Sequence, residues 1–246
     1  MKSPVEYLHR SNRGPSKVEG LSRKSLQVYD FLIFDCDGVI LDSNSIKSEA
    51  FRYSLMGYPT DAIDELMEFH HQHGGISRYV KFEYFFSKIL GNIAFEQELK
   101  NVLNHFQTYV FDRLIECPLV PGIEEILIYL SNQQKRCFVI SGADEVELHQ
   151  ILSAHALIGY FETVFGSPAT KTEIMRDLFK STGMSPHNGL FFVFPSARAI
   201  VEYPNNVPIS IMGPSNLHAS FANFFNALNS TLLTVPPSKR RWFLPE

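Results

Sequence analysis

The hydrophobic and polar positions divide the chain into a first strand, a long helical stretch, and a run of alternating strands and helices. A continuous apolar run predicts a strand over residues 29–36. Residues 44–116 then repeat their apolar positions at helical spacing, which predicts helices over 46–57, 61–71, 77–90 and 93–115. Helix ends are expected within this stretch at Gly74-Gly75 and Gly91-Asn92.

A different pattern begins at Pro118, where short apolar runs alternate with helical periodicity. The apolar runs predict strands over 136–141, 163–166, 190–194 and 207–212. The segments before, between and after them predict helices over 122–133, 144–156, 171–182, 196–203 and 217–229. Apolar strands separated by helices are typical of a parallel sheet that is covered on both faces. The sequence therefore predicts an α/β fold, a doubly wound parallel sheet with a helical insert after its first strand.

These elements divide the chain into two domains and two tails. The core domain comprises residues 29–43 and 118–232, and the cap domain comprises the helical residues 44–117. Residues 1–28 form a polar, basic N-terminal tail, and residues 233–246 form the C-terminal tail. We interpret the N-terminal tail as flexible. The alternative is a docking arm for an anionic partner.

The composition is that of an ordinary globular protein, with 45% hydrophobic and 20% charged residues. The net charge of −4 does not favour a nucleic-acid partner. No segment is long and apolar enough to span a bilayer, and the N-terminus lacks the apolar stretch of a secretory signal. The three cysteines match no zinc or disulfide pattern. We therefore expect a cytoplasmic protein without a membrane or nucleic-acid partner.

Two carboxylates follow the first predicted strand. Asp35 and Asp37 are two residues apart, so they leave the strand on the same face. One carboxylate of such a pair can attack as a nucleophile, while the other carries protons. Gly38 allows the tight turn that follows. The alternative is a structural turn in which an aspartate bonds its own backbone.

Two further polar residues fall at or just after strand ends. Ser141 ends the strand predicted over 136–141, and Lys171 follows the strand predicted over 163–166. Ligands of doubly wound sheets bind beyond the carboxyl ends of the strands, so both residues are candidates for the same site as Asp35. The alternatives are a helix N-cap for Ser141 and a solvated lysine at a helix start for Lys171.

The string over residues 31–43 resembles the first motif of the haloacid dehalogenase (HAD) superfamily, D-x-D-G-V-[IL]-x-D-S. The resemblance extends over about residues 29–215 and points to the branch of helical C1-capped phosphatases and phosphomutases. It implies a Rossmann-like core sheet with an inserted α-helical cap. It also implies a small phosphorylated metabolite as the ligand and Mg²⁺ as the cofactor.

The resemblance implies roles for the residues at the strand ends. Asp35 is expected to attack phosphorus, and Asp37 to protonate the leaving oxygen and then activate water. Ser141 corresponds to the residue that hydrogen-bonds the transferred phosphoryl group, and the adjacent Gly142 is a candidate substrate contact. Lys171 corresponds to the lysine that neutralises charge around the nucleophile and the phosphate.

The resemblance breaks at the fourth motif, where the family reads G-D-[ST]-x-x-D and supplies a direct and an indirect magnesium ligand. After Val193 this chain continues without an acidic residue, as Phe194-Pro195-Ser196-Ala197-Arg198-Ala199. Only Asp35 and the carbonyl of Asp37 remain as ligands for an ion that prefers hard oxygen donors. We therefore expect Mg²⁺ to be weakly bound or absent. The alternative is that Glu202, the nearest acid, replaces a missing ligand.

The cap contains candidate contacts to an anionic substrate. Arg78 and Lys81 are predicted on one face of a helix that Ser77 caps, and Arg52 lies in the first cap helix. The alternative for these residues is surface charge. His70 and His73 share a helix face, so a transition-metal pair is conceivable, and a polar helix end is the other interpretation. The cap core is expected to contain Phe82, Phe85 and Phe86.

Two functions remain open. The first is a HAD-like phosphohydrolase that acts on a small phosphorylated metabolite through an aspartyl-phosphate on Asp35, impaired by the loss of the fourth-motif acids. The second is a non-catalytic protein of the same fold that binds a phosphorylated ligand or a protein partner. The first three motifs favour the enzyme, and the missing fourth motif favours the binding protein.

Overall fold

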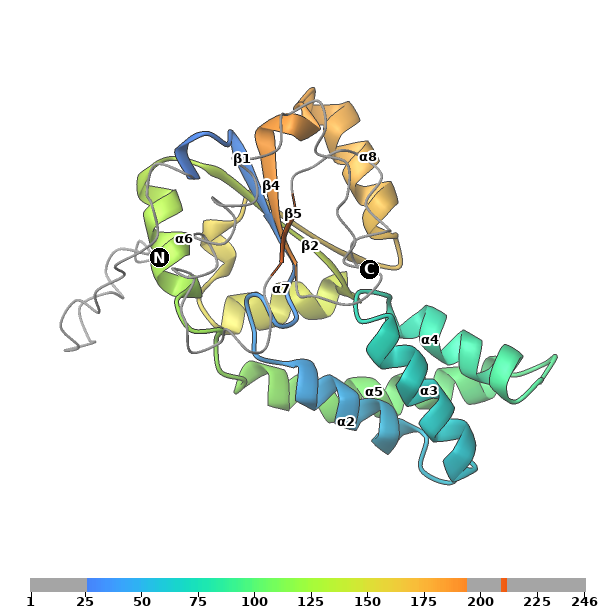
Figure 1. Ribbon diagram of the computed structural model, residues 1–246. Helices are drawn as coiled ribbons and strands as arrows, with labels where there is room; N and C mark the ends of the chain where they lie inside the picture. The colour runs from blue at the N-terminus through green and yellow to red at the C-terminus, as the bar shows by residue number, and fades with distance from the viewer. Residues whose placement is uncertain (1–25, 194–208, 212–246) are drawn as a thin grey trace, which may run out of the picture.

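The computed structural model describes residues 26–193 and the backbone of residues 209–211. Within these ranges the chain forms a parallel sheet with helices on both faces, and a separate group of helices lies beyond the carboxyl ends of the strands (Figure 1). The helices predicted over 196–203 and 217–229 lie outside the described residues, as do residues 1–25 and the C-terminal tail.

The sheet has five parallel strands in the order β3-β2-β1-β4-β5. Their bounds are β1 Phe31–Phe34, β2 Arg136–Asp144, β3 Thr163–Ser167, β4 Gly189–Val193 and β5 Ile209–Ile211. The order runs outward from β1 in both directions, so the winding reverses between β1 and β4. Ligands of such sheets bind beside this reversal. The predicted doubly wound parallel sheet is confirmed.

The other elements of the described ranges are helical. In the core they are α6 Ile123–Asn132, α7 Glu145–Ala154 and α8 Lys171–Thr182, with the short turns η3 Ile158–Tyr160 and η4 Pro186–Asn188. In the cap they are α2 Asn44–Ser54, α3 Thr60–Gln72, α4 Arg78–Tyr84, η2 Phe85–Ile89 and α5 Glu96–Ile115. None of these helices combines the length and the apolar character that crossing a bilayer requires.

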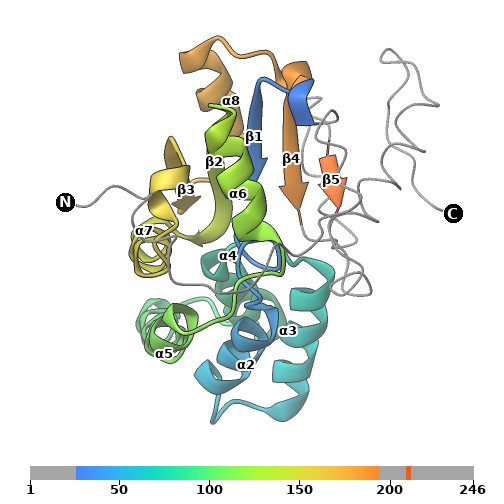
Figure 2. The same cartoon turned by 90° about the vertical axis from the view of Figure 1, so that its left-hand side faces the viewer.

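The central strand β1 is buried on both faces, as its continuous apolar sequence predicts. Phe31 and Ile33 pack with side chains of α8 on one face of the sheet. Leu32 and Phe34 belong to the larger cluster on the other face, which includes side chains of α6 and α7 (Figure 2). Burial of each large apolar side chain stabilises the fold by roughly 1.5–3 kcal/mol. Asp35, which follows β1, is therefore fixed in position by the packing on both faces of the sheet.

The cap is organised around buried aromatic side chains, and Phe82, Phe85 and Phe86 are fully buried as predicted. The single helix predicted over 77–90 is wrong in its second half, because α4 ends at Tyr84 and η2 is a π-helix. A π turn contains one more residue than an α turn. The wider turn lets the adjacent rings of Phe85 and Phe86 both reach Tyr58, at centroid distances of 5.3 and 5.6 Å.

Strand β2 continues to Asp144 rather than ending at Ser141 as predicted. A register shift between Ile140 and Asp144 lets the strand resume its pairing with β3. Asp144 is therefore the N-cap of α7, and its carboxylate accepts a hydrogen bond from the backbone N–H of Glu147 at 3.0 Å. The alternative interpretation of Ser141 as this N-cap is wrong.

Gly189→Ala is expected to destabilise the core by about 1–3 kcal/mol, because the added methyl group overpacks it. Gly189 pairs with Phe31 across β4 and β1, and a Cβ at this position would overlap the Phe31 ring. That ring is held against Phe138 and Phe179, at centroid distances of 6.4 and 5.8 Å. Urea unfolding measures the loss. The double variant with Phe31→Leu should recover part of it, and an unchanged midpoint for Gly189→Ala would contradict the packing.

Candidate active site

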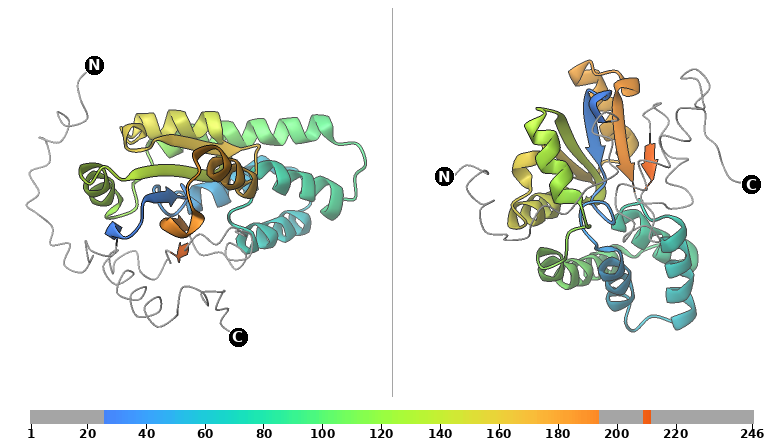
Figure 3. Two further views of the ribbon diagram at one scale, coloured as in Figure 1. Left: turned by 90° about the horizontal axis from the view of Figure 1, so that it is seen from above. Right: turned by 60° about the vertical axis from the view of Figure 1, so that its left-hand side comes forward.

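A cavity of about 150 Å³ lies between the carboxyl ends of the core strands and the cap. Six of the candidate residues from the sequence line it, namely Asp35, Asp37, Arg78, Lys81, Gly142 and Lys171. They come from the end of β1, from α4, from β2 and from the start of α8 (Figure 3). Because the carboxyl ends of parallel strands meet at one edge of the sheet, Asp35 and Lys171 lie at the same cavity although they are more than a hundred positions apart in the sequence.

Asp35 directly follows β1 and extends its pairing, because its backbone N–H donates to the Phe192 carbonyl at 2.9 Å. One carboxylate oxygen, Oδ1, accepts from the backbone N–H of Cys36 at 2.8 Å. The other, Oδ2, accepts from Lys171 Nζ at 2.5 Å. Lys171 is only 8% exposed, so the interpretation as a solvated lysine is wrong. The two side chains form a buried ion pair on the cavity wall.

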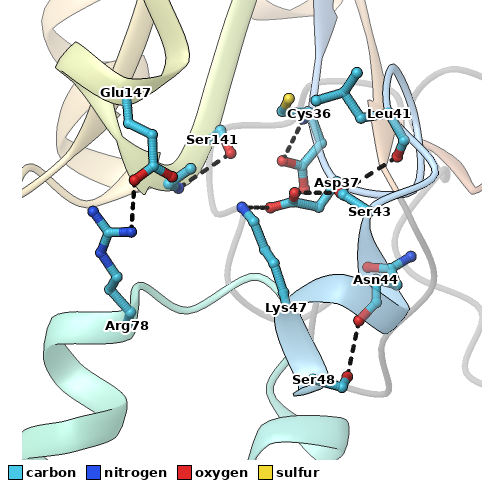
Figure 4. A network of polar contacts seen from close by, with 12 residues as sticks. Cys36, Asp37, Leu41, Ser43, Asn44, Lys47, Ser48, Arg78, Ser141 and Glu147 are labelled. Atoms are coloured by element: carbon cyan, nitrogen blue, oxygen red, sulfur yellow. Dashed lines mark hydrogen bonds and ion pairs between the residues drawn. The ribbon is translucent and has the colours of Figure 1, made fainter. Parts of the chain in front are cut away.

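Asp37 lies on the turn that Gly38 makes at φ 70°, where the Gly38 N–H donates to the Leu41 carbonyl at 2.7 Å. Its Oδ1 accepts from the Ser43 hydroxyl at 2.6 Å, and its Oδ2 accepts from Lys47 Nζ at 2.6 Å (Figure 4). Burial alone would raise the pKa of Asp37. The Lys47 ammonium and the Ser43 hydroxyl outweigh burial and hold that pKa below its usual value.

Lys47 is a site residue that sequence analysis missed. It lies on the first turn of α2 and lines the same cavity as Asp35 and Lys171. A signal was present, because Ser43 and Lys47 are four residues apart at the start of a predicted helix and share a face. That face begins six residues after Asp37, which is close enough for the chain to turn back.

Lys81 is 1% exposed and donates to His70, with 2.8 Å between Nζ and Nδ1. Burial, helped by the nearby Lys47, lowers the pKa of Lys81 to about 7. Burial and the Lys81 charge lower the pKa of His70 to about 3, so the imidazole is neutral at physiological pH. Its Nε2 then donates to the Ser48 hydroxyl, 3.1 Å away. The interpretation of Lys81 as surface charge is therefore wrong.

Arg78 is also buried, and it links the cap to the core. Its Nη1 donates to Glu147 Oε2 on α7 at 2.8 Å, and the two side chains are 7% and 1% exposed. The adjacent Tyr79 hydroxyl donates to Asp144 Oδ2 at 2.9 Å. A Cβ on Gly142 would lie 2.6 Å from the Gly75 carbonyl oxygen, so glycine is required at this close approach. Sequence analysis missed Glu147, and the interpretation of Arg78 as surface charge is wrong.

Other candidate residues lie outside the cavity wall. Ser141 is fully buried, and its hydroxyl accepts from the backbone N–H of Ala143 at 3.2 Å. Arg52 is 54% exposed and pairs with Asp64 at 2.9 Å, so the structure does not bring it to the cavity. Ser77 flanks α4, but its side chain makes no capping hydrogen bond. The fourth-motif segment and Glu202 lie outside the described residues.

The histidine pair does not form a metal site. His73 Nδ1 lies 2.8 Å from the Phe69 carbonyl, and its ring stacks on Phe69 at a centroid distance of 4.1 Å. His70 instead faces Lys81 and Ser48. Across the part of the chain that the structure describes, no group of three or more His, Cys, Asp or Glu side chains is placed to hold a metal ion.

The described residues do not fit Mg²⁺ at the aspartates. Each carboxylate oxygen of Asp35 and Asp37 already accepts a hydrogen bond, and for each residue one donor is a lysine ammonium. Mg²⁺ prefers free carboxylate and carbonyl oxygens in octahedral geometry. An ion placed here would lie against two positive charges, those of Lys47 and Lys171, and the segment 194–199 contains no acid to offset them.

Comparisons with known proteins identify the fold and family. The family model described as haloacid dehalogenase-like hydrolase matches residues 32–192, more than half of the chain. A predicted phosphatase from Clostridium acetobutylicum is 20% identical with a TM-score of 0.60, covering 85% of this chain and 100% of that chain. A predicted phosphoglycolate phosphatase from Haemophilus somnus is 17% identical with a TM-score of 0.56, covering 75% and 84%.

A third structure is that of a CbbY mutant from Rhodobacter sphaeroides in complex with xylulose-(1,5)-bisphosphate. It is 12% identical with a TM-score of 0.61, and the match covers 75% of this chain and 86% of that chain. No curated protein matches the sequence. At these identities the solved structures show a shared fold, and the family model shows the family.

Stability is expected to rise with pH above neutrality because of Lys81. Its pKa is about 7 in the folded protein, against about 10.4 for an unperturbed lysine. Between these values the unfolded chain binds one more proton, so the free energy of unfolding rises by up to about 1.4 kcal/mol per pH unit. Lys81→Met should remove this part of the slope and raise stability at pH 7. Urea unfolding between pH 7 and 10 measures both effects.

The control for this experiment is Lys88→Met, which removes an exposed lysine of the same cap segment. The control should keep the slope of the natural protein. Equal slopes for Lys81→Met and the natural protein would contradict the low pKa of Lys81.

Proposed function

The chain belongs to the haloacid dehalogenase-like hydrolases, and from this premise we propose that it is a phosphohydrolase acting through an aspartyl-phosphate on Asp35. The observation that carries the proposal is the buried pairing of Asp35 with Lys171 on the wall of the cavity. A nucleophilic carboxylate and a cation that offsets phosphate charge are the two groups that phosphoryl transfer to an aspartate requires. Asp37, two residues away, is placed to carry protons.

The reaction divides into two displacements at phosphorus. In the first, a carboxylate oxygen of Asp35 bonds to phosphorus, the bond to the ester oxygen breaks, and that oxygen takes a proton from Asp37. In the second, water attacks phosphorus and gives its proton to Asp37, so that inorganic phosphate leaves and the Asp35 carboxylate is restored. Lys171 offsets the charge of the phosphoryl group in both displacements.

Turnover is slow in this proposal for two physical reasons. The sequence lacks the fourth-motif acids, so Mg²⁺ is weakly bound or absent and does not align the transferring group. The ion pair with Lys47 favours the carboxylate form of Asp37. That form can take a proton from water, but it cannot donate one to a leaving alcohol. The first displacement is therefore the slower of the two.

The ligand class is a small phosphorylated metabolite. The cavity volume of about 150 Å³ is small, and it is lined by Lys47 and Lys171, the two lysines that pair with the aspartates. The structural neighbour CbbY is described with a sugar bisphosphate, which supports a phosphorylated small molecule in this fold. In this proposal, the cap residues that line the cavity determine which phosphorylated metabolite it accepts.

A second candidate function is the binding of a phosphorylated ligand, or of a protein partner, without catalysis. The observation that favours it is that both aspartates are already paired with lysines. A pocket whose carboxylates are neutralised holds an anion more readily than one with free carboxylates. In this case the phosphoryl group would bind beside Asp35 and leave unchanged.

A phosphatase screen with and without Mg²⁺ tests the enzyme proposal. The natural protein should release phosphate from small phosphate esters at rates well below the roughly 10 s⁻¹ that is typical of enzymes. Asp35→Asn should abolish the release, because the amide is not a nucleophile. The matched control is Asp177→Asn on the exposed side of α8, which should hydrolyse like the natural protein. Hydrolysis that survives Asp35→Asn would refute the aspartyl-phosphate, and binding without hydrolysis would favour the second function.

Restoring the fourth motif tests the origin of the impairment. The triple variant Phe194→Gly, Pro195→Asp and Ala199→Asp should bind Mg²⁺ more tightly and raise magnesium-dependent hydrolysis, because it supplies the missing carboxylates. Calorimetry measures Mg²⁺ binding to both proteins. Tight, stoichiometric binding of Mg²⁺ by the natural protein would overturn the proposed impairment and make Glu202 the candidate ligand.

A further inference from the structure

Lys47 belongs to the cap by sequence but reaches Asp37 of the core (Figure 4). Its ammonium lies 2.6 Å from Asp37 Oδ2, and its side chain is only 14% exposed. It lines the same cavity as Asp35 and Lys171. A surface ion pair contributes little and moves freely, whereas a charge at this depth needs a fixed partner. Lys47 is therefore held in a fixed position at the site.

Two side chains at the start of α2 hydrogen-bond to both carboxylate oxygens of Asp37. The Ser43 hydroxyl donates to Oδ1 at 2.6 Å while Lys47 donates to Oδ2 at 2.6 Å. The backbone N–H of Lys47 donates to the Ser43 carbonyl at 3.0 Å, so the two side chains leave the same turn. Ser43 is fully buried, which removes the freedom of the turn to move. The position of the Lys47 ammonium is thereby fixed relative to the cavity.

The charge of each aspartate at the site is offset by one lysine, without a metal ion. Asp37 is paired with Lys47, and Asp35 is paired with Lys171. A phosphate dianion is repelled by uncompensated carboxylates at short range, so a site of this kind needs positive charge before the anion can enter. The chain lacks acids at 194–199, and two lysines occupy the carboxylate oxygens that remain. The donor set that disfavours Mg²⁺ is thus the one that favours a bare anion.

We propose that Lys47 is the resident counter-cation of the phosphate site, and that with Lys171 it makes phosphate binding beside Asp35 independent of a divalent metal ion. The inference rests on the proposed function for the ligand class, and it adds the residue that determines how the site is charged. Lys47 acts through Asp37, so it is a positioning and charge-compensating residue. Its loss exposes the Asp37 charge to the incoming anion.

Calorimetric titration with inorganic phosphate tests this inference on the full chain, once in EDTA and once in excess Mg²⁺. The natural protein should bind phosphate with the same affinity in both conditions. Lys47→Met should lose about tenfold or more of that affinity in EDTA, because one carboxylate is left unpaired. Mg²⁺ should restore part of the loss in this variant only. The matched control, Lys180→Met, removes an exposed lysine of α8 and should bind like the natural protein.

Two further variants separate charge from structure. Lys47→Arg keeps the positive charge and should retain phosphate binding in EDTA. The double variant Lys47→Met with Asp37→Asn removes both charges, so it should fold without an unpaired carboxylate and bind phosphate within a few-fold of the natural protein. Circular dichroism verifies the fold of each variant. This pair keeps the test decisive if Lys47→Met alone is unstable.

The outcomes distinguish this inference from the proposed function. Phosphate binding by the natural protein that requires Mg²⁺, or equal affinities of Lys47→Met and the natural protein in EDTA, would overturn the role of Lys47 and leave the phosphohydrolase standing. Absence of phosphate binding by the natural protein in both conditions would overturn the proposed function and this inference with it. Metal-independent binding that is lost in Lys47→Met and regained in the double variant supports both.

Discussion

The buried ion pair between Asp35 and Lys171 is the interaction on which the site depends. Asp35 follows β1, which is buried along its whole length, and Lys171 is the first residue of α8, where the helix dipole disfavours a cation. Removing one partner of such a pair costs about 3–5 kcal/mol, because the other charge stays buried and unpaired. The pair therefore fixes the end of β1 against the start of α8, and it places a carboxylate and an ammonium on the same cavity wall.

The cap is held over this wall by polar contacts from one short segment. Arg78 pairs with Glu147 and Tyr79 bonds Asp144, while Gly142 of the core allows the cap backbone to approach closely. Arg78 Nε and Glu147 Oε1 have no hydrogen-bond partner among the described residues. A ligand that drew Arg78 away would leave Glu147 buried and charged, which is costly. Arg78 is therefore better suited to docking the cap than to binding the substrate.

Local pattern was sufficient to predict the sheet, most helices and the residues at strand ends. Asp35 and Lys171 could be placed together because the carboxyl ends of parallel strands share one edge, whatever the detailed packing. The partner of Arg78 could not be predicted, because Glu147 reaches it only once the cap is seated on the core. Lys47, the partner of Asp37, was missed although its spacing from Ser43 was a local signal. The π turn at Phe85 was also missed, since it depends on how two adjacent rings pack inside the cap.

A site whose positive charge comes from side chains differs in kind from one that holds a metal ion. A divalent ion carries two charges and orients phosphate oxygens through its octahedral geometry, whereas a lysine carries one charge on a flexible stem. Lysines can thus compensate an anion without aligning it for in-line attack. Lys47 also favours the ionised form of Asp37, which opposes protonation of a leaving group. The missing fourth-motif acids and the presence of Lys47 act in one direction, toward a site that binds phosphate more effectively than it turns it over.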